Sequence, residues 1–267
     1  MVFEVKGQKL VKSQTITGFE GLVGWWNDIQ LIDIDNDGDQ DVIAANLGLN
    51  SRYKASLEYP LNVYARDFDS NGTLDAILTY YNNGKEYPIP DRALITQQIP
   101  PIKKKFTSNI KYAESTIDEV FPKSILESAY QLNATHFGTS IFENTGDGKF
   151  VSKELPNNVQ YSRVNTILTW DIDGDGLKDL VLGGNSNATD VFTGNYDAQT
   201  SLILRNLGGF KFESISTFGT GFPDNGVITD LQLLSVGNSQ MILSLRNNEN
   251  AILSKLTKIN LESQSGR

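Results

Sequence analysis

One short acidic pattern occurs three times in this chain of 267 residues, and it constrains the structure more than any other feature. Each copy has Asp at positions 1, 3 and 9, Asp or Asn at position 5, and Gly at position 6. The copies are the Asp33 loop (residues 33–41), the Asp67 loop (67–75) and the Asp171 loop (171–179). Carboxylates at this density repel one another unless a cation lies between them. Three copies with one spacing indicate a repeated structural unit.

The spacing of the acidic residues predicts calcium sites. Alternate residues place hard oxygen ligands on one side of a tight turn, Gly provides the bend, and position 7 offers its carbonyl, as in the first nine positions of an EF-hand loop. We expect up to three Ca²⁺ ions. The predicted ligands are Asp33, Asp35, Asp37, Asp39 and Asp41; Asp67, Asp69, Asn71, Thr73 and Asp75; and Asp171, Asp173, Asp175, Leu177 and Asp179.

Two other interpretations of the acidic loops stay open. They could be solvated turns without an ion. They could also supply the paired carboxylates of a glycoside hydrolase, but a catalytic pair occurs once whereas this pattern recurs. Repetition therefore favours metal ligation.

Strands rather than helices are expected on both sides of each loop. An EF-hand loop ends with a bidentate Glu at position 12 and lies between helices. Here position 12 is Ala44, Leu78 or Leu182. The flanking runs are short, apolar and rich in β-branched residues, and Gly, Asn or Asp bound them. The sequence thus predicts an all-β fold in which each ion ties a β-hairpin.

The order of strand, acidic loop and apolar strand resembles the FG-GAP/VCBS repeat of β-propellers, as in the integrin α-chain head and many secreted bacterial proteins. Two hairpins with Asn-x-Gly turns, at 140–150 and 201–210, are similar to the outer strands of such blades. From Gly21 to about Asn248 the chain is also similar to bacterial VCBS-repeat proteins of the Bacteroidetes type, through residues 24–27, 46–50, 103–106 and 135–137. The resemblance implies a partial propeller of about three four-stranded blades. It does not imply an enzyme.

Loop spacing predicts how the blades are arranged. Asp33 and Asp171 are 138 residues apart, whereas Asp171 and Asp230, a degenerate loop position, are 59 apart. One blade needs about 40–60 residues, so the first interval holds a blade and an insertion. We expect outer strands of a preceding blade in 1–20, a blade in 21–155 with an insertion at about 51–135, a blade in 156–222, and a degenerate blade with a tail in 223–267. The rival layout, which gives the Asp67 loop its own blade, leaves only 34 residues between Asp33 and Asp67.

The insertion is expected to contain the helices. Asp91 can cap a helix over 92–98, and the segments 116–119 and 124–127 both have the form of a capping box. We expect a small helical excursion over 88–134. Long insertions often carry function, so this one is the candidate partner surface.

Charge restricts the partners. The net charge is −9, and the three loops hold 12 of the 32 acidic residues, so nucleic acid and anionic membranes are poor partners. No apolar run is long enough to cross a membrane. We expect a protein or glycan ligand, with the remainder of the propeller in a preceding part of the protein. Millimolar calcium outside cells favours an extracellular, cell-surface or periplasmic location, although the first residues do not form a signal peptide.

The sequence favours a calcium-stiffened module for binding or scaffolding, without enzymatic activity, on an exported bacterial protein. The alternative is a carbohydrate-binding or polysaccharide-degrading propeller. Any Ser–His–Asp triad would have to use His136, the one histidine of the chain. Its place at an expected strand start is more typical of a packed residue than of a catalytic base.

Overall fold

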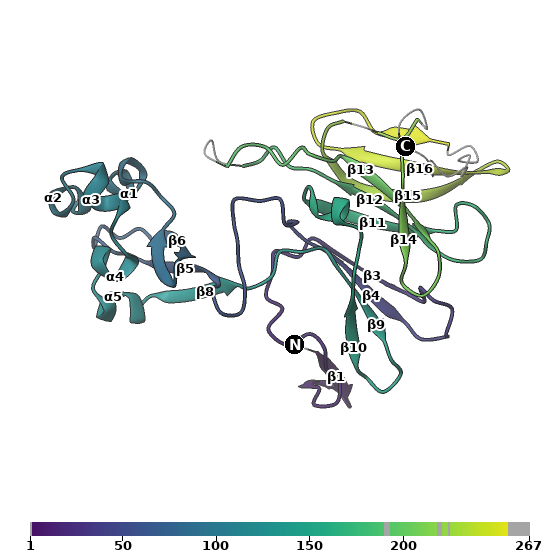
Figure 1. Cartoon of the computed structure of the whole chain (residues 1–267), viewed down its shortest axis with the longest axis horizontal. Coiled ribbons are helices and arrows are strands. Elements are labelled where there is room, and N and C mark those ends of the chain that lie inside the picture. The colour runs from purple at the N-terminus through teal and green to yellow at the C-terminus, as the bar shows by residue number, and fades with distance from the viewer. Residues whose placement is uncertain (1, 190–192, 218–220, 224, 256–267) are drawn as a thin grey trace. The chain divides into compact units, whose positions relative to one another are not determined.

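A computed structural model describes residues 2–189, 193–217, 221–223 and 225–255; residues 256–267, which end the segment 223–267 expected to hold the degenerate blade and the tail, lie outside them. The described chain is mostly β, in small antiparallel sheets, which agrees with the expected all-β class (Figure 1). It divides into two compact units. Unit 1 comprises Met1–Glu20, Trp25–Arg52 and Gly138–Arg267, and unit 2 comprises Gly21–Gly24 and Tyr53–Phe137.

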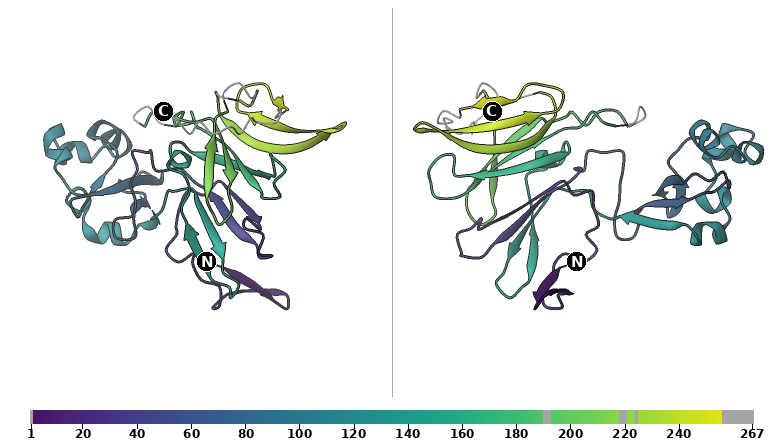
Figure 2. Two further views of the ribbon diagram at one scale, coloured as in Figure 1. Left: turned by 45° about the vertical axis from the view of Figure 1, so that its right-hand side comes forward. Right: turned by 180° about the vertical axis from the view of Figure 1, so that it is seen from behind.

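Within its described residues, unit 1 contains four sheets. Figure 2 shows the ribbon from two further directions. A two-stranded sheet joins β1 (Phe3–Lys6) and β2 (Lys9–Lys12). The first four-stranded sheet has the order β10-β9-β4-β3, with β3 (Asp28–Ile32), β4 (Asp41–Ala45), β9 (Ser140–Asn144) and β10 (Phe150–Lys153). The second has the order of β11 (Val164–Trp170), β12 (Asp179–Gly184), β13 (Ser201–Asn206) and β14 (Phe212–Ile215), and the short 3-10 helix η1 (Asn157–Gln160) precedes it. A three-stranded sheet follows, with β15 (Ile228–Val236), β16 (Ser239–Arg246) and β17 (Ile252–Ser254).

Strand β12 shows how the sheets of unit 1 pack. Successive side chains of a strand point to opposite faces. Leu180 and Leu182 lie in one core with Ile43 of the first four-stranded sheet, whereas Val181 lies in another core with Ile228 of the three-stranded sheet. Every residue of β12 is buried. A strand covered on both faces explains the continuous apolar run that follows the Asp171 loop.

The first four-stranded sheet joins segments far apart in the sequence. In the pairing of β4 with β9, Val42 lies opposite Phe142 and Ile43 opposite Ile141. Most of unit 2, residues 53–137, lies between these two strands in the chain. The hairpin of β9 and β10 thus completes a sheet that β3 and β4 begin.

Unit 2 consists of one sheet and five short helices. The sheet order is β7-β6-β5-β8, with β5 (Leu61–Arg66), β6 (Asp75–Asn82), β7 (Lys85–Pro88) and β8 (Tyr130–Ala134). The helices are α1 (Arg92–Gln98), α2 (Ile102–Lys105), α3 (Asn109–Ala113), α4 (Ile117–Val120) and α5 (Lys123–Glu127). Ile77 of β6 shares a core with Ile95 of α1 and Phe121 after α4. Within the described residues, no helix is long and apolar enough to cross a membrane.

The helical expectations for the insertion are confirmed in part. Asp91 caps α1, because its side chain accepts a hydrogen bond from the N–H of Leu94 at 2.8 Å. The box at 116–119 forms, since the Glu119 carboxylate accepts from the N–H of Thr116 at 2.8 Å. The box expected to start at Ser124 is wrong, because α5 begins at Lys123 and Pro122 occupies the N-cap position, so Ser124 lies inside the helix.

The expected extent of the helical excursion is also wrong at its end. Residues Tyr130–Ala134 form strand β8, which pairs with β5, Leu61 lying opposite Ala134. Four of the five residues of β8 are exposed, so they lack the apolar alternation that marks a strand in the sequence. The partner strand, distant in the sequence, determines their conformation.

Candidate metal centres

In all three loops, the carboxylate at position 1 closes the turn. One of its oxygens accepts the N–H of position 6, and the other accepts an N–H from position 4 or 5. The bonds run to Asp33 from Asp37 (3.1 Å) and Gly38 (3.0 Å), to Asp67 from Asn71 (3.0 Å) and Gly72 (2.8 Å), and to Asp171 from Gly174 (2.7 Å) and Gly176 (3.0 Å). The same local hydrogen bonds therefore build each loop. At Asp67 the Gly72 N–H lowers the pKa of the carboxyl.

The aspartate at position 9 ties each loop to its strands. Asp41, Asp75 and Asp179 are only 1%, 2% and 1% exposed. In each, Oδ2 accepts the N–H of position 2, at 3.0 Å in the Asp33 and Asp67 loops and 2.8 Å in the Asp171 loop. Burial raises the pKa of Asp41 and Asp179, and these backbone hydrogen bonds oppose the rise. Position 9 therefore holds the loop in place whether or not an ion is bound.

Position 5 makes a contact inside the loop. Its side-chain oxygen accepts the N–H of position 7. The pairs are Asp37 with Asp39 (2.8 Å), Asn71 with Thr73 (2.7 Å) and Asp175 with Leu177 (2.9 Å). Asp39, Thr73 and Leu177, which were expected to offer carbonyl ligands, are thus held in the turn by position 5.

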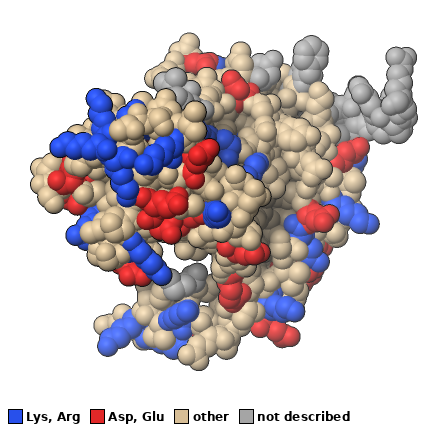
Figure 3. Space-filling model, turned by 60° about the vertical axis from the view of Figure 1, so that its left-hand side comes forward, with Lys and Arg blue, Asp and Glu red and all other residues tan. Residues whose placement is uncertain are grey.

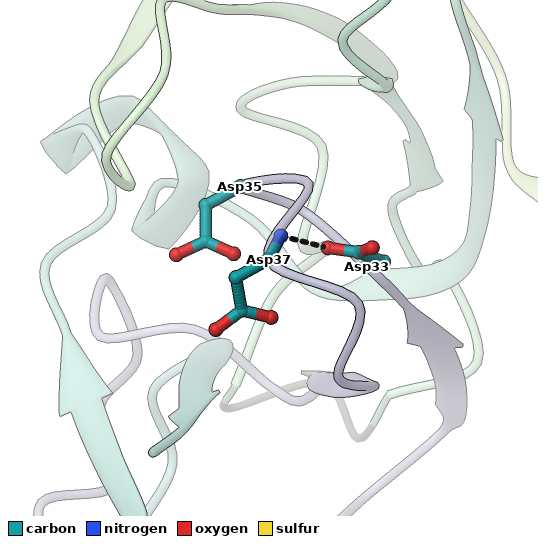
Figure 4. A group of neighbouring side chains, drawn as sticks. All are labelled: Asp33, Asp35 and Asp37. Atoms are coloured by element: carbon teal, nitrogen blue, oxygen red, sulfur yellow. Dashed lines mark hydrogen bonds between the residues drawn. The ribbon is translucent and has the colours of Figure 1, made fainter. Parts of the chain in front are cut away.

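Each loop brings three carboxylates together. In the Asp33 loop, single oxygens of Asp33, Asp35 and Asp37 lie within 4.8 Å of one another (Figure 4). The same holds for positions 1, 3 and 9 of the other two loops. Those residues are Asp67, Asp69 and Asp75, and Asp171, Asp173 and Asp179. The three clusters could hold metal ions, and oxygen-only ligands are the type that Ca²⁺ and Mg²⁺ prefer.

Asp35 provides the test of whether the Asp33 loop fits a cation. Its Oδ1 is buried and has no hydrogen-bond partner among the described residues. Burial, and then the charge of Asp37, raise the pKa of this carboxyl. Within the described part of the chain, no Lys or Arg forms an ion pair with any carboxylate of this loop. A buried carboxylate oxygen without a partner is costly, and a bound cation would satisfy it.

The Asp171 loop forms ion pairs with an arginine from another hairpin. Arg205 on β13 places Nε 2.7 Å from Oδ2 of Asp173 and Nη2 3.7 Å from Oδ2 of Asp175. Sequence reasoning missed Arg205 because it lies on a different hairpin from the loop. Comparing the two Asn-x-Gly hairpins could have found it, since the residue before the Asn is Glu143 in one and Arg205 in the other.

The two acidic loops of unit 1 are in contact. The side-chain amide of Asn36 donates to the carbonyl of Gly176 at 3.2 Å. The amide of Asn206, which is fully buried, donates to the carbonyls of Ile34 at 2.8 Å and Lys178 at 3.1 Å. One side chain therefore holds a residue of each loop.

Glycine is required at position 6 but not at position 4. At position 6, Gly176 has φ +91°, and all three copies have Gly there. At position 4, Gly174 has φ +80°, but the other two copies have Asn36 and Ser70 with φ near 60°. We expect Gly176→Ala to lower the free energy of unfolding by about 1–2 kcal/mol through backbone strain. Gly174→Asn should change it by less than about 0.5 kcal/mol, because Asn tolerates this region. Urea unfolding of both variants checks the pair, and equal losses would contradict it.

Unit 2 carries two open pockets besides its acidic loop. One, of about 300 Å³, is lined by Tyr80, Tyr87, Pro90 and Arg92 among others. The other, of about 670 Å³, has Glu86 and Tyr64 in its wall, and the Tyr64 hydroxyl donates to Glu86 at 3.1 Å. Charged side chains of both signs lie close together on the face seen in Figure 3. Unit 2 thus offers polar hollows of ligand size.

No protein-family model matches the sequence, and no curated protein matches it. The function is therefore argued from the residues and their geometry.

Proposed function

We propose that the chain is a calcium-binding module without enzymatic activity, a part of a β-propeller of the FG-GAP/VCBS type, which holds a partner-binding unit in place. The observation that carries the proposal is Asp35, whose buried Oδ1 has no partner within the described residues. It stands in a group of three carboxylates without an ion pair from any described Lys or Arg. A bound Ca²⁺ would supply positive charge and accept oxygen ligands at this point.

The loop residues act mechanically in this proposal. Position 1 closes the turn, and position 9 fixes the turn to the strand that follows it. Position 3 of the Asp33 loop adds a carboxylate whose buried Oδ1 has no hydrogen-bond partner among the described residues. Neutralising that charge stiffens a hairpin whose strands belong to the stacked sheets of unit 1. The sheet stack would then act as the rigid support.

Unit 2 is the proposed binding part. It lies in the sequence between two strands of one sheet, where a long insertion is tolerated. Its pockets support a protein or glycan ligand, since Tyr80 and Tyr87 provide aromatic surface beside the charged Arg92. In an exported protein, millimolar calcium would keep weak loop sites filled. Sites with dissociation constants near 10⁻⁴ M would each contribute about 1.4 kcal/mol at about 1 mM Ca²⁺.

Thermal unfolding with and without calcium tests the metal sites. We expect about 2 mM Ca²⁺ to raise the midpoint by at least about 5 °C relative to excess EGTA, because several sites bind only the folded chain. An equal concentration of Mg²⁺ should have a smaller effect, since Mg²⁺ demands a regular octahedral shell. Identical midpoints with Ca²⁺ and with EGTA would refute the proposal.

Asp35→Asn provides the matched control for the loop. In EGTA the variant should be as stable as the parent or more stable, because it removes a negative charge from a carboxyl group that has a buried oxygen without a hydrogen-bond partner among the described residues. In Ca²⁺ it should lose part of the stabilisation, because the amide is a poorer ligand than the carboxylate. Asp147→Asn, an exposed residue in the turn after β9, should behave as the parent in both conditions. Destabilisation of Asp35→Asn in EGTA would mean that the side chain has a structural role instead.

A further inference from the structure

The two loops of unit 1 are equivalent in backbone but not in charge. In the first four-stranded sheet, the N–H of Asn144 donates to Oδ1 of Asp41 at 2.8 Å. In the second, the N–H of Asn206 donates to Oδ1 of Asp179 at 2.8 Å. The strand registers agree, because Val42 pairs with Phe142 as Leu180 pairs with Leu204. The residue before each Asn therefore occupies the same place beside its acidic loop.

That equivalent place holds opposite charges in the two sheets. It is Glu143 in the first sheet, where the carboxylate pairs with Lys153 at 2.8 Å. It is Arg205 in the second, where the guanidinium pairs with position 3 of the loop, Asp173, at 2.7 Å. The corresponding position-3 residue in the first sheet is Asp35, which has the buried oxygen without a partner among the described residues.

We propose that Arg205 is a tethered counter-cation of the Asp171 loop, which competes with a divalent ion for Asp173 and makes the two loops of unit 1 fill at different ion concentrations. This inference rests on the proposed calcium binding. Two of the three guanidinium nitrogens, Nε and Nη2, face carboxylates of the loop. Filling the loop requires Oδ2 of Asp173 to leave Arg205, and the fixed positive charge also opposes a second cation nearby. The Asp33 loop has no such competitor among the described residues, so it should fill first.

The test isolates the Asp171 loop and then removes the arginine. In a chain carrying Asp35→Asn and Asp69→Asn, calcium binding measured by titration calorimetry reports mainly the Asp171 loop. Adding Arg205→Gln should tighten that binding by about tenfold or more, since an opposing charge is removed from a few ångströms away. The matched control is Lys211→Gln, which makes the same change of net charge at an exposed residue in the turn between β13 and β14 and should leave the affinity unchanged. Unchanged or weaker binding in the Arg205→Gln chain would overturn the inference.

Two further measurements keep the inference falsifiable if Arg205→Gln folds poorly. Arg205→Met keeps the aliphatic stem and should tighten binding to the same degree. In the parent chain, the Nε–H resonance of Arg205 should shift as calcium fills the Asp171 loop. A resonance that stays fixed while the loop fills would show that Arg205 does not compete.

Failure of the inference and failure of the proposed function are distinguishable. If calcium binds the parent chain but Arg205→Gln does not tighten the Asp171 loop, the competition fails and the calcium-binding function stands. If no loop binds calcium in any variant, the competition by Arg205 and the calcium-binding function are both refuted. In EGTA, Arg205→Gln should still lower the midpoint of unfolding by a few degrees, because Asp173 loses its counter-charge. Lys211→Gln should not.

Discussion

Replacing Asp179 by Ala should lower the free energy of unfolding of unit 1 by about 3–5 kcal/mol in EGTA, and by at least as much in calcium. The carboxylate is 1% exposed and accepts the N–H of Ile172 and the N–H of Asn206, each at 2.8 Å. Hydrogen bonds to a charged acceptor are worth about 1.5–3 kcal/mol each. Alanine would leave both donors without an acceptor in a buried place. The expected loss is a large part of a typical net stability of about 5–15 kcal/mol.

Urea unfolding followed by circular dichroism measures this loss. Asp147→Ala is the control, since Asp147 is exposed in the turn between β9 and β10 and should change the stability by less than about 0.5 kcal/mol. The comparison between EGTA and calcium separates two roles of position 9, as the anchor of the loop and as a calcium ligand. A loss confined to calcium would mean that Asp179 acts as a ligand only, and a loss below about 1 kcal/mol in EGTA would contradict the anchoring role.

Local features of this chain were predictable because their causes are local. The strand limits Asp28–Ile32 and Val164–Trp170 agree with the apolar runs before two of the loops. Asp91 caps α1 as its position after Pro90 predicts. The loops themselves close through hydrogen bonds within nine residues, so a repeated nine-residue pattern is enough to foresee their shape.

Features that depend on distant partners were not predictable. Strand β8 forms because β5 offers an edge to pair with, and its own exposed residues carry no periodic signal. Arg205 reaches the Asp171 loop from a separate hairpin, so its role follows from strand register and not from spacing along the chain. The contact of Asn206 with Ile34 joins two residues that are 172 positions apart in the sequence. Stacking of the sheets creates that contact, and the sequence around either residue contains no pattern that predicts it.

Asn206→Ala should be the second most damaging substitution, with an expected loss of about 3 kcal/mol in the free energy of unfolding of unit 1. The amide is fully buried, donates to the carbonyls of Ile34 and Lys178, and accepts the N–H of Gly208 at 2.9 Å. Alanine would leave two buried carbonyls without these donors, at about 1–3 kcal/mol each when no water replaces them. The effect is large because a single side chain donates hydrogen bonds to a backbone carbonyl of each of the two neighbouring loops.

Asn144→Ala is the matched control, because Asn144 occupies the same place in the first four-stranded sheet. Among the described residues, its amide donates to the carbonyl of Gln40 alone, at 3.3 Å, and accepts the N–H of Gly146 at 3.1 Å, and the residue is partly exposed. Water can replace these contacts, so a loss of about 1 kcal/mol is expected. Urea unfolding of both variants in EGTA measures the difference. Equal losses at the two positions would mean that the turn, and not the bridge between the Asp33 and Asp171 loops, accounts for the effect.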